Sequence, residues 1–231
     1  MKIGTRPLVV IALVIASIFA RLGFWQLSRL HDRRALNAEL ASRAVAPAVP
    51  ISQLPVDTAN AHYRRVSVDG KYDYANEIKL TLRSRDGSPG INIVTPVRLP
   101  GTDTALMVVR GWVYAPDGMT VDLNRWREPA HAAGHGFVET FPPARTGRNS
   151  SPTHSNAYRW LDRAVLEKRF HYPLEPYYVV LTSLPADSGT NAPPRLEVPP
   201  MDEGPHQSYA IQWFSFAAIS IIGMTLFIRR K

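Results

Sequence analysis

Two long apolar stretches, one at each end of this 231-residue chain, limit what it can fold into. Residues 7–27 (PLVVIALVIASIFARLGFWQL) contain a single charge, at Arg21, and residues 209–228 contain none. A helix rises about 1.5 Å per residue, so the first stretch would reach about 31 Å and match the hydrocarbon core of a bilayer. We therefore predict transmembrane helices at residues 7–27 and 209–228.

The N-terminal stretch has a second interpretation, which the sequence leaves open. Lys2 and Arg6 precede an apolar run that ends in small residues, and this is also the pattern of a cleaved signal peptide. In that case the chain would keep one C-terminal anchor. The same stretch carries small residues at helical spacing, which let another membrane helix approach closely: Ala12, Ala16, Ala20 and Gly23.

Charges beside the two stretches predict their orientation. Arg229, Arg230 and Lys231 follow the second stretch and place the C-terminus in the cytoplasm by the positive-inside rule. Two spans put both termini on the same side, so residues 31–205 become a periplasmic (extracytoplasmic) domain of a bacterial-type inner membrane protein. Three arginines just outside the first span conflict with this orientation: Arg29, Arg33 and Arg34. We give more weight to the C-terminal cluster and to the parity of the spans.

The region between the spans alternates between apolar and polar residues, which is typical of β-strands. The strand-like segments lie at residues 63–73, 76–84, 91–99, 104–114, 136–141 and 176–184. Asp69-Gly70 predicts a hairpin turn, and residues 157–170 predict a helix. Proline-rich linkers flank the region. The fold class is thus a membrane protein whose two transmembrane helices flank an α+β, strand-dominated domain, built as an antiparallel sheet or a small barrel.

Composition excludes several kinds of site. The chain has no cysteine, which rules out disulfides, thiolate nucleophiles, cysteine zinc sites and iron–sulfur clusters. Its net charge of +8 is spread without a run of five basic residues, so we expect membrane lipid and no nucleic acid as a partner. His131 and His135 have the spacing of a helical zinc pair, but Pro129 and Gly134 beside them predict a surface loop. Because no catalytic motif occurs, we predict that the protein is not an enzyme.

Polar and aromatic residues gather where the second apolar stretch begins, in GPHQSYAIQWFSF at residues 204–216. On a helix, His206 shares one face with five further residues: Ala210, Trp213, Ala217, Ser220 and Met224. The first stretch brings Trp25 and Gln26 to the same membrane interface, with Arg29 one turn further on. Paired helices would thus join an imidazole, aromatic rings and arginines, which is what a haem needs. Alternatively, the aromatic residues are interface anchors of the kind found in many membrane proteins.

Five stretches together resemble the surfeit locus protein family, whose members are membrane assembly factors of cytochrome c oxidase. They are LGFWQLSR (22–29), YRRVSVDGKYD (63–73), GINIVTPV (90–97), MVVRGWV (107–113) and PHQSYAIQWFSFA (205–217). The stretches occur in the family's order and span the chain. The sequence departs from the family pattern at Gln207-Ser208, where a leucine is expected soon after the histidine, and in its arginine- and proline-rich middle.

The resemblance implies a function in building the haem and copper core of the oxidase. Some bacterial members are thought to bind haem a, and the histidine proposed as its iron ligand corresponds here to His206. Other residues that match the signatures are Trp25, Gln26, Tyr209, Gln212, Trp213 and Arg110-Gly111-Trp112. We expect transient binding of haem a, with His206 as the ligand of the haem iron. The expected partners are the catalytic subunit of cytochrome c oxidase, which would receive the haem, and the enzyme that makes haem a.

Two alternatives remain for the function, and one for the RGW motif. The protein could be a membrane scaffold that stabilises an oxidase assembly intermediate without haem, using a surface around residues 110–113. An anchored enzyme or ligand-binding domain would instead need a concave polar site in the strand domain. Because residues 110–112 lie in an apolar strand, we favour a structural role in which Trp112 fills the core and Gly111 allows a bulge or a close approach.

Overall fold

The computed structural model describes residues 5–55, 57–151, 155–182 and 191–230. Its contacts divide the chain into two units, a helical unit of residues 1–39 and 200–231 and a strand domain of residues 40–199. The helical unit therefore combines the two ends of the chain, and the strand domain contains the middle.

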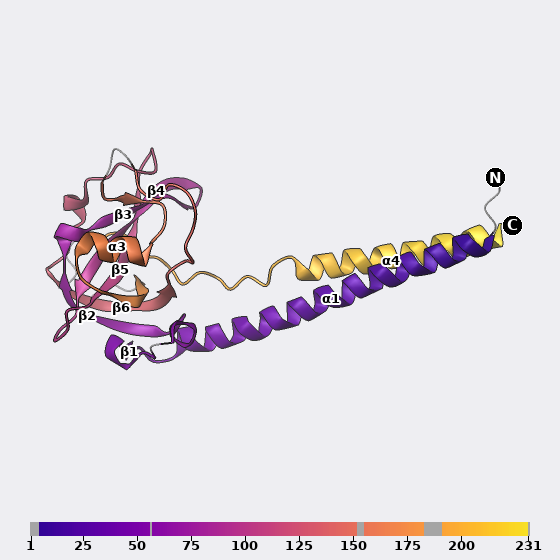
Figure 1. Ribbon diagram of the computed structural model, residues 1–231, viewed down its shortest axis with the longest axis horizontal. Coiled ribbons are helices and arrows are strands. Elements are labelled where there is room, and N and C mark those ends of the chain that lie inside the picture. Colours follow the sequence, from indigo (N-terminus) through magenta and orange to yellow (C-terminus); the bar gives the residue numbers. More distant parts are fainter. Residues whose placement is uncertain (1–4, 56, 152–154, 183–190, 231) are drawn as a thin grey trace. The chain divides into compact units, whose positions relative to one another are not determined.

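The helical unit is formed by α1 (Thr5–Val45) and α4 (His206–Arg229), which lie side by side (Figure 1). α1 continues well past the apolar stretch because no glycine or proline occurs between Gly23 and Pro47 to interrupt it. Both helices are long and apolar enough to cross a membrane, with mean hydropathies of 2.3 and 1.8 in their most apolar windows. This length and composition are compatible with a membrane protein.

Small residues of α1 face α4, as the spacing of the alanines predicted. Ala16 is only 6% exposed. Gly23 lies so close to the ring of Phe214 that a Cβ atom at this position would be 2.7 Å from a ring carbon. On α4, the predicted face contains the residues that are least exposed, together with Phe214: His206, Ala210, Trp213, Ala217, Ser220 and Met224. The close approach of two helices along a stripe of small residues is thus confirmed.

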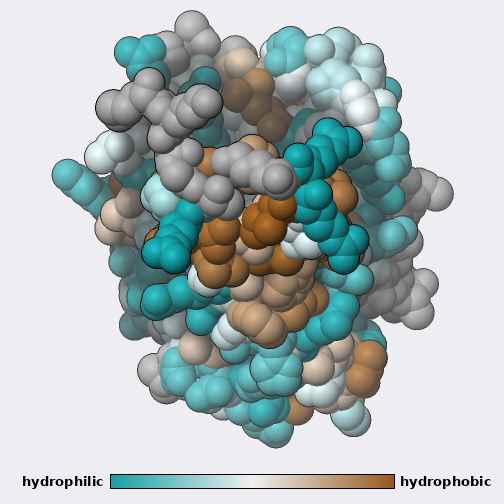
Figure 2. Space-filling view, turned by 90° about the vertical axis from the view of Figure 1, so that its right-hand side faces the viewer, coloured by the Kyte–Doolittle hydropathy of each residue, from teal (hydrophilic) through white to brown (hydrophobic). Residues whose placement is uncertain are grey.

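The outward surfaces of the helix pair are apolar. Several isoleucines on both helices are more than half exposed: Ile11 (53%), Ile18 (52%), Ile211 (62%) and Ile219 (64%). In the space-filling view of Figure 2, brown hydrophobic side chains gather on the face turned toward the viewer. An apolar surface of this extent is stable against lipid or another apolar partner, and not against water.

The strand domain is an α+β domain in which strands dominate. Its strands are β1 (Val49–Pro50), β2 (Arg65–Tyr72), β3 (Ile78–Arg85), β4 (Ser88–Arg98), β5 (Ala105–Tyr114), β6 (His131–Thr140), β7 (Ala157–Tyr158) and β8 (Leu174–Leu181). Between them lie the short helices η1 (Ile51–Gln53), α2 (Thr58–Ala61), η2 (Tyr74–Asn76), η3 (Leu123–Trp126) and α3 (Arg163–Phe170). Within the described residues, the strands form one sheet in the order β1-β2-β6-β8-β5-β4-β3-β7. The predicted α+β, strand-dominated domain between two apolar helices is confirmed.

Five of these strands close into a small barrel, because β2 pairs with β4 as well as with β6. In this closing pair Lys71 faces Arg98 and Tyr72 faces Val97. The ring of strands is β2-β6-β8-β5-β4, and its neighbours are antiparallel except for β5 and β8, which run parallel. The sheet is therefore closed on itself, with β1 and the β3-β7 pair attached to its outside.

The hairpin turn predicted at Asp69-Gly70 is wrong. Both residues lie inside β2, where Asp69 faces Ala133 and Gly70 faces Ala132 of β6. Glycine is needed here for another reason: a Cβ atom at position 70 would lie 2.5 Å from the backbone oxygen of Arg98. At this point β2 leaves β6 and closes onto β4, so barrel closure overrides the local preference for a turn.

Two apolar cores support the barrel. The first fills its interior with alternate residues of all five strands, among them Val66, Val68, Val97, Leu106, Val108, Val138, Val179 and Leu181. The second lies outside, where Leu166 and Phe170 of α3 pack with Met107 and Val109 of β5. β5 is thus covered on both faces, which agrees with its nearly continuous apolar sequence.

The helix predicted for residues 157–170 is shorter in the structure. Ala157 and Tyr158 form β7, and α3 begins at Arg163. The carboxylate of Asp162 accepts a hydrogen bond from the backbone N–H of Val165 at 3.2 Å. Aspartate is favoured at this capping position, so the helix starts there and not six residues earlier.

The proline-rich segment at residues 191–199 lies against β5, beside a bulge. The pairing of β4 with β5 shifts its register so that Arg110 is skipped. The backbone N–H of Trp112 donates to the oxygen of Pro194 at 2.9 Å. A Cβ atom at Gly111 would lie 2.9 Å from the oxygen of Pro193 and would collide with that of Pro194. The bulge and the close approach predicted for the RGW motif are both confirmed.

Replacing Gly111 with alanine should lower the free energy of unfolding by about 1–3 kcal/mol, because the new methyl group would push the segment at 191–199 away from β5. Thermal unfolding of the detergent-solubilised full chain, followed by circular dichroism, measures this loss. The control Gly223→Ala adds the same group where no atom lies within 4 Å, and because alanine suits a helix interior it should not lower the transition. Equal transitions for Gly111→Ala and the wild type would contradict the close packing.

Candidate functional site

The two ends of the chain meet at a hydrogen bond within the helical unit. Nδ1 of His206, the first residue of α4, lies 2.8 Å from Oε1 of Gln26 on α1. Gln26 is only 8% exposed, and the imidazole ring is half-buried. The structure thus brings together two of the predicted site residues, which are 180 positions apart in the sequence.

The turn before α4 sets the position of the imidazole ring. Gly204 adopts a left-handed conformation with φ of 71°, and its N–H donates to the carboxylate of Asp202 at 2.8 Å. Pro205 caps the helix, and its carbonyl accepts the Ser208 hydroxyl at 2.8 Å. A Cβ atom at Gly204 would lie 3.4 Å from Cδ2 of the ring and 3.5 Å from Nε2. Glycine therefore permits the turn and leaves space beside Nε2 of His206.

Polar side chains of α1 hold the same turn, and we call this group the arginine clamp. Arg34 donates two hydrogen bonds to the carboxylate of Glu203, at 3.0 and 2.9 Å. Arg33 and Asn37 both donate to the backbone oxygen of Asp202, at 3.0 and 3.1 Å. Each contact is exposed and contributes little alone, but together they fix the chain as it enters α4.

Aromatic rings of the two helices contact one another about two helical turns from the histidine. Phe19 stacks on Trp213 with 5.7 Å between ring centroids, and Phe216 touches both, at 5.6 and 5.9 Å. Phe24 meets Phe214 edge to face at 5.2 Å. Trp213 lies two helical turns beyond the histidine on the same face of α4, so the imidazole is followed by a layer of flat apolar side chains.

The other predicted site residues lie on exposed surfaces of the helices. Trp25 is 52% exposed and Tyr209 is 46% exposed. Arg29 forms an ion pair with Asp32 at 3.1 Å, and half of its side chain is exposed. Half-exposed Trp and Tyr side chains at the end of an apolar helix suit contact with lipid headgroups. Arg29 keeps donors available for an anionic group, because a guanidinium has five N–H groups.

A shallow apolar groove continues between the helices beyond the aromatic layer. Its volume is about 500 Å³, and its walls are mostly short side chains: Leu13, Ala16, Ser17, Ala20, Ala217, Ala218, Ile221 and Ile222. The alanines that let the helices approach also leave this space open at the surface of the pair.

The strand domain contains a separate cluster of charges around Arg110, which has no exposed surface. Nη1 of Arg110 donates to Glu77 at 2.7 Å, and Nε donates to Glu128 at 2.9 Å. The rings of Tyr72 and Tyr74 lie 5.1 and 5.2 Å from the guanidinium carbon. A fully buried cation is thus matched by two carboxylates and two aromatic faces.

A second arginine completes this buried network. Arg195 donates to both carboxylate oxygens of Glu128 and to the backbone oxygen of Arg110. Burial raises the pKa of Glu77, while the hydrogen bond from Thr95 and the charge of Arg110 act against this rise. Two guanidinium groups balance two carboxylates, and they tie the segment at 191–199 to the barrel. The network is therefore a structural element of the domain.

The surface that the scaffold alternative expected at residues 110–113 is not exposed. Arg110 is 0% and Val113 only 2% exposed, and Gly111 is covered by residues 193 and 194. Trp112 is half-buried, with its ring against Gly90. Arg110 turns inward because it is the bulged residue of β5 and meets two buried carboxylates there. A scaffold would therefore have to use another surface.

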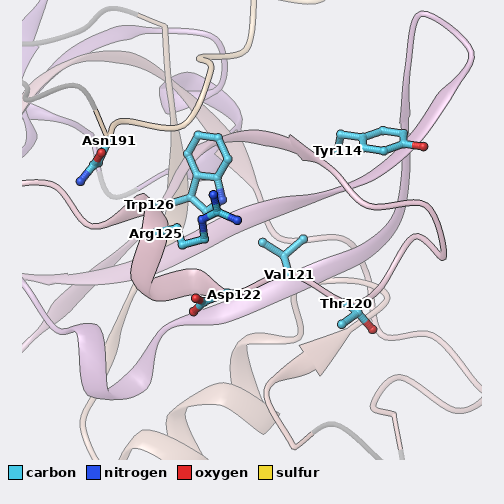
Figure 3. Close-up of a pocket in the computed structure, with 7 residues that line it drawn as sticks. All are labelled: Tyr114, Thr120, Val121, Asp122, Arg125, Trp126 and Asn191. Atoms are coloured by element: carbon cyan, nitrogen blue, oxygen red, sulfur yellow. The ribbon is translucent and has the colours of Figure 1, made fainter.

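A polar hollow of about 490 Å³ lies next to this network (Figure 3). Its lining residues are Tyr114, Thr120, Val121, Asp122, Arg125, Trp126 and Asn191. Arg110 donates to the backbone oxygen of Trp126, and the carboxylate of Asp122 caps η3 by accepting the N–H of Asn124 at 3.1 Å. Among the described residues, no group of three or more His, Asp or Glu side chains could hold a metal ion. The carboxylate in the hollow thus already has a structural function.

The surface loop predicted around His131 and His135 is a strand. Both residues lie in β6, because this stretch pairs with β2 along its whole length. Four residues span about 13 Å in a strand, which is too far for two histidines to bind one metal ion. His131 is exposed and lies 3.4 Å from Asp69.

Sequence reasoning missed the partners in both polar clusters. In the strand domain these are Glu77, Glu128 and Arg195, and in the arginine clamp they are Asp202 and Glu203. One signal was available: arginines follow the first apolar stretch and carboxylates precede the second, so opposite charges flank the two helices. Within the domain, a lone arginine in an apolar strand indicated a buried cation, but nothing nearby identified its carboxylates.

Together, the fold and the helical site define a class of protein: two terminal apolar helices that join at a polar end, with a small five-stranded barrel between them in the sequence. The family model described as the SURF1 family matches residues 13–218. The chain belongs to the SURF1 family.

Relatives of this family are similar along most of the chain. A SURF1-like protein of Rickettsia felis is 23% identical over 227 residues, covering 96% of each chain. A SURF1-like protein of Monosiga brevicollis is 26% identical over 235 residues, covering 91% of this chain and 83% of the relative. Surfeit locus protein 1 of Mus musculus is 32% identical over 120 residues, which is 49% of this chain and 36% of the mouse protein.

Replacing Arg110 with alanine should lower the free energy of unfolding by about 3–5 kcal/mol near pH 7, because Glu77 and Glu128 lose a buried counter-charge. The pKa of Glu77, already raised by burial, should rise further without the arginine. When the pKa of a carboxyl group is higher in the folded than in the unfolded protein, the folded protein gains stability as the pH falls through that pKa. This stability is lost again as the pH rises. The difference in stability between variant and wild type should therefore narrow as the pH is lowered from neutral, which thermal unfolding at several pH values measures.

The matched control for this prediction is Arg125→Ala. Arg125 is exposed, so its removal should change the stability by about 0.5 kcal/mol or less. An Arg110→Ala protein as stable as the wild type, or a difference that widens on acidification, would contradict the buried network.

Proposed function

We propose that this protein is an assembly factor for cytochrome c oxidase that binds haem a transiently and passes it to the catalytic subunit of the oxidase. Membership of the SURF1 family supports a function in oxidase assembly. One observation carries the proposal of haem binding. Nδ1 of a half-buried histidine at the polar end of two paired apolar helices is occupied by a glutamine oxygen, so Nε2 is left for a ligand.

The side chains at this end suit a haem. Nε2 of His206 would bind the iron, as neutral imidazole does in many haem proteins. Phe19 and Trp213, about two helical turns further along the pair, offer flat apolar contacts, and Arg29 can pair with a propionate. Apolar walls with a few placed polar groups are typical of cofactor sites. Trp25 and Tyr209, which are exposed, would contact lipid or the edge of the porphyrin.

A carrier must release what it binds, and the site suits this requirement. We assign the iron one protein ligand, His206, so that release would need only the exchange of that ligand for one of the oxidase subunit. The enzyme that makes haem a would be the donor. The chain itself would form and break no other bond, and we infer that it acts as a carrier and not as an enzyme.

The proposed orientation places both termini in the cytoplasm and the strand domain outside. The basic residues after α4 support it by the positive-inside rule. The arginines after the first apolar stretch opposed this orientation in the sequence, and the arginine clamp offers a reason to discount them. Arg34 pairs with the carboxylate of Glu203, so its charge is partly neutralised within the protein, and Arg33 is held by the uncharged backbone oxygen of Asp202.

Replacing His206 with alanine should remove haem from the protein. The full chain is produced in cells that make haem a and purified in detergent, and its absorption spectrum is compared with that of His206→Ala. The wild type should show the bands of haem a, and the variant should lose them because the iron has lost its ligand. The control is His131→Ala, which removes an exposed histidine from the strand domain and should leave the spectrum unchanged.

The same experiment tests the scaffold alternative. If neither wild type nor variant carries haem while both are folded in the membrane, the proposal of a carrier is wrong. Assembled oxidase that stays at the wild-type level with His206→Ala would then favour a scaffold, and the aromatic residues would be interface anchors.

The orientation can be tested directly, because the chain has no cysteine of its own. Asp103→Cys places a thiol in the exposed turn between β4 and β5, and Arg230→Cys places one after α4. A membrane-impermeant maleimide applied from the periplasmic side should label the first variant, and the second should react only once the inner membrane is permeabilised. The opposite pattern would overturn the orientation.

A further inference from the structure

Gln26 forms a direct hydrogen bond with the His206 ring and does not merely lie near it. It is the largely buried polar residue of α1, at 8% exposure, and its Oε1 atom is 2.8 Å from Nδ1 of the ring. A buried amide oxygen without a donor would lose free energy, and the imidazole supplies that donor. The two side chains therefore satisfy each other across the helix pair.

The direction of this hydrogen bond determines the tautomer of the ring. A carbonyl oxygen can only accept, so Nδ1 must carry the proton that is donated to Gln26. In a neutral imidazole the other nitrogen then has no proton and holds a free electron pair. Nε2 of His206 is thus the nitrogen able to bind a metal.

The surroundings of Nε2 agree with this assignment. Among the described residues, no side chain or backbone group forms a hydrogen bond with Nε2 of His206. Gly204, with φ of 71°, lies beside this nitrogen, where a Cβ atom would come within 3.5 Å of it. Residue 204 thus presents no side chain to Nε2, and Gln26 binds the opposite nitrogen of the ring.

We propose that Gln26 is the positioning residue of the haem site: it holds the His206 ring in the tautomer with the proton on Nδ1 and directs Nε2 to the iron. This inference rests on the proposed function. In it, Gln26 contacts His206, the ligand of the iron, and does not contact the haem itself. Partners of this kind raise the basicity of a metal-binding histidine and fix its orientation.

The tautomer can be measured without haem. The full-length protein, labelled with ¹⁵N-histidine, is studied by NMR in detergent near pH 8.5, well above the ordinary pKa of imidazole. His206→Ala identifies the signals of this ring. In the wild type, Nδ1 should have the shift of a protonated ring nitrogen and Nε2 that of an unprotonated one. Gln26→Leu removes the acceptor at similar volume, so a substantial share of the ring should change to the tautomer with the proton on Nε2.

Haem affinity provides the second readout. Haem a is titrated into the apo-protein in detergent, and Gln26→Leu should bind it about 10–100-fold more weakly than the wild type, as is usual when the partner of a ligating histidine is lost. Gln26→Glu keeps an acceptor for the Nδ1 proton, so it should bind haem nearly as well and lower the reduction potential of the iron. The matched control is Gln207→Leu, the same change at an exposed residue next to the histidine, which should alter neither readout.

The outcomes separate this inference from the proposed function. If the wild-type ring carries its proton on Nε2, the amide donates instead of accepting and the inference is overturned. It is also overturned if Gln26→Leu changes neither tautomer nor affinity, although His206→Ala abolishes binding. If Gln26 sets the tautomer but haem a binds to no form of the protein, the proposed function fails, and the role toward iron fails with it.

Discussion

The buried guanidinium of Arg110 is the interaction on which the strand domain depends. It reaches Glu77 before β3, Glu128 before β6 and, through Glu128, Arg195 in the segment at 191–199. Charges that are shielded from water must be matched within the protein. The network therefore fixes how β5, the residues before β3, the residues before β6 and the segment at 191–199 pack together. The barrel supplies the apolar core, and the network ties these segments to β5.

The helical unit applies a similar principle with different residues. Its small side chains allow close contact between the helices, and the polar groups sit at one end, where Gln26 meets His206. Small residues alone would permit several registers of one helix against the other. A single buried hydrogen bond and the arginine clamp select one of them, because any shift would leave polar groups without partners.

Local patterns in the sequence were sufficient to predict individual strands and helices. They were insufficient to predict which distant residues these elements contact. Alternation at Ile78 and Leu80 identified a strand, and helical spacing identified the face of α4 that contains His206 and Trp213. The turn at Asp69-Gly70 failed because barrel closure is a contact between distant strands, and a local signal carries no information about it. The partners of Arg110 and the hydrogen bond to Gln26 were out of reach for the same reason, since they join residues far apart in the chain.

The arginine clamp and the hydrogen bond between His206 and Gln26 respond differently to dissolved salt. Its ion pair between Arg34 and Glu203 is about half exposed, so dissolved salt screens it, whereas the hydrogen bond between His206 and Gln26 is largely shielded from water. High ionic strength should therefore loosen the entry into α4 before it disturbs the imidazole. The polar end of the helix pair thus combines an exposed ion pair that responds to salt with a shielded hydrogen bond that does not. A charged surface of a partner protein would therefore act on the arginine clamp and leave the hydrogen bond between His206 and Gln26 intact.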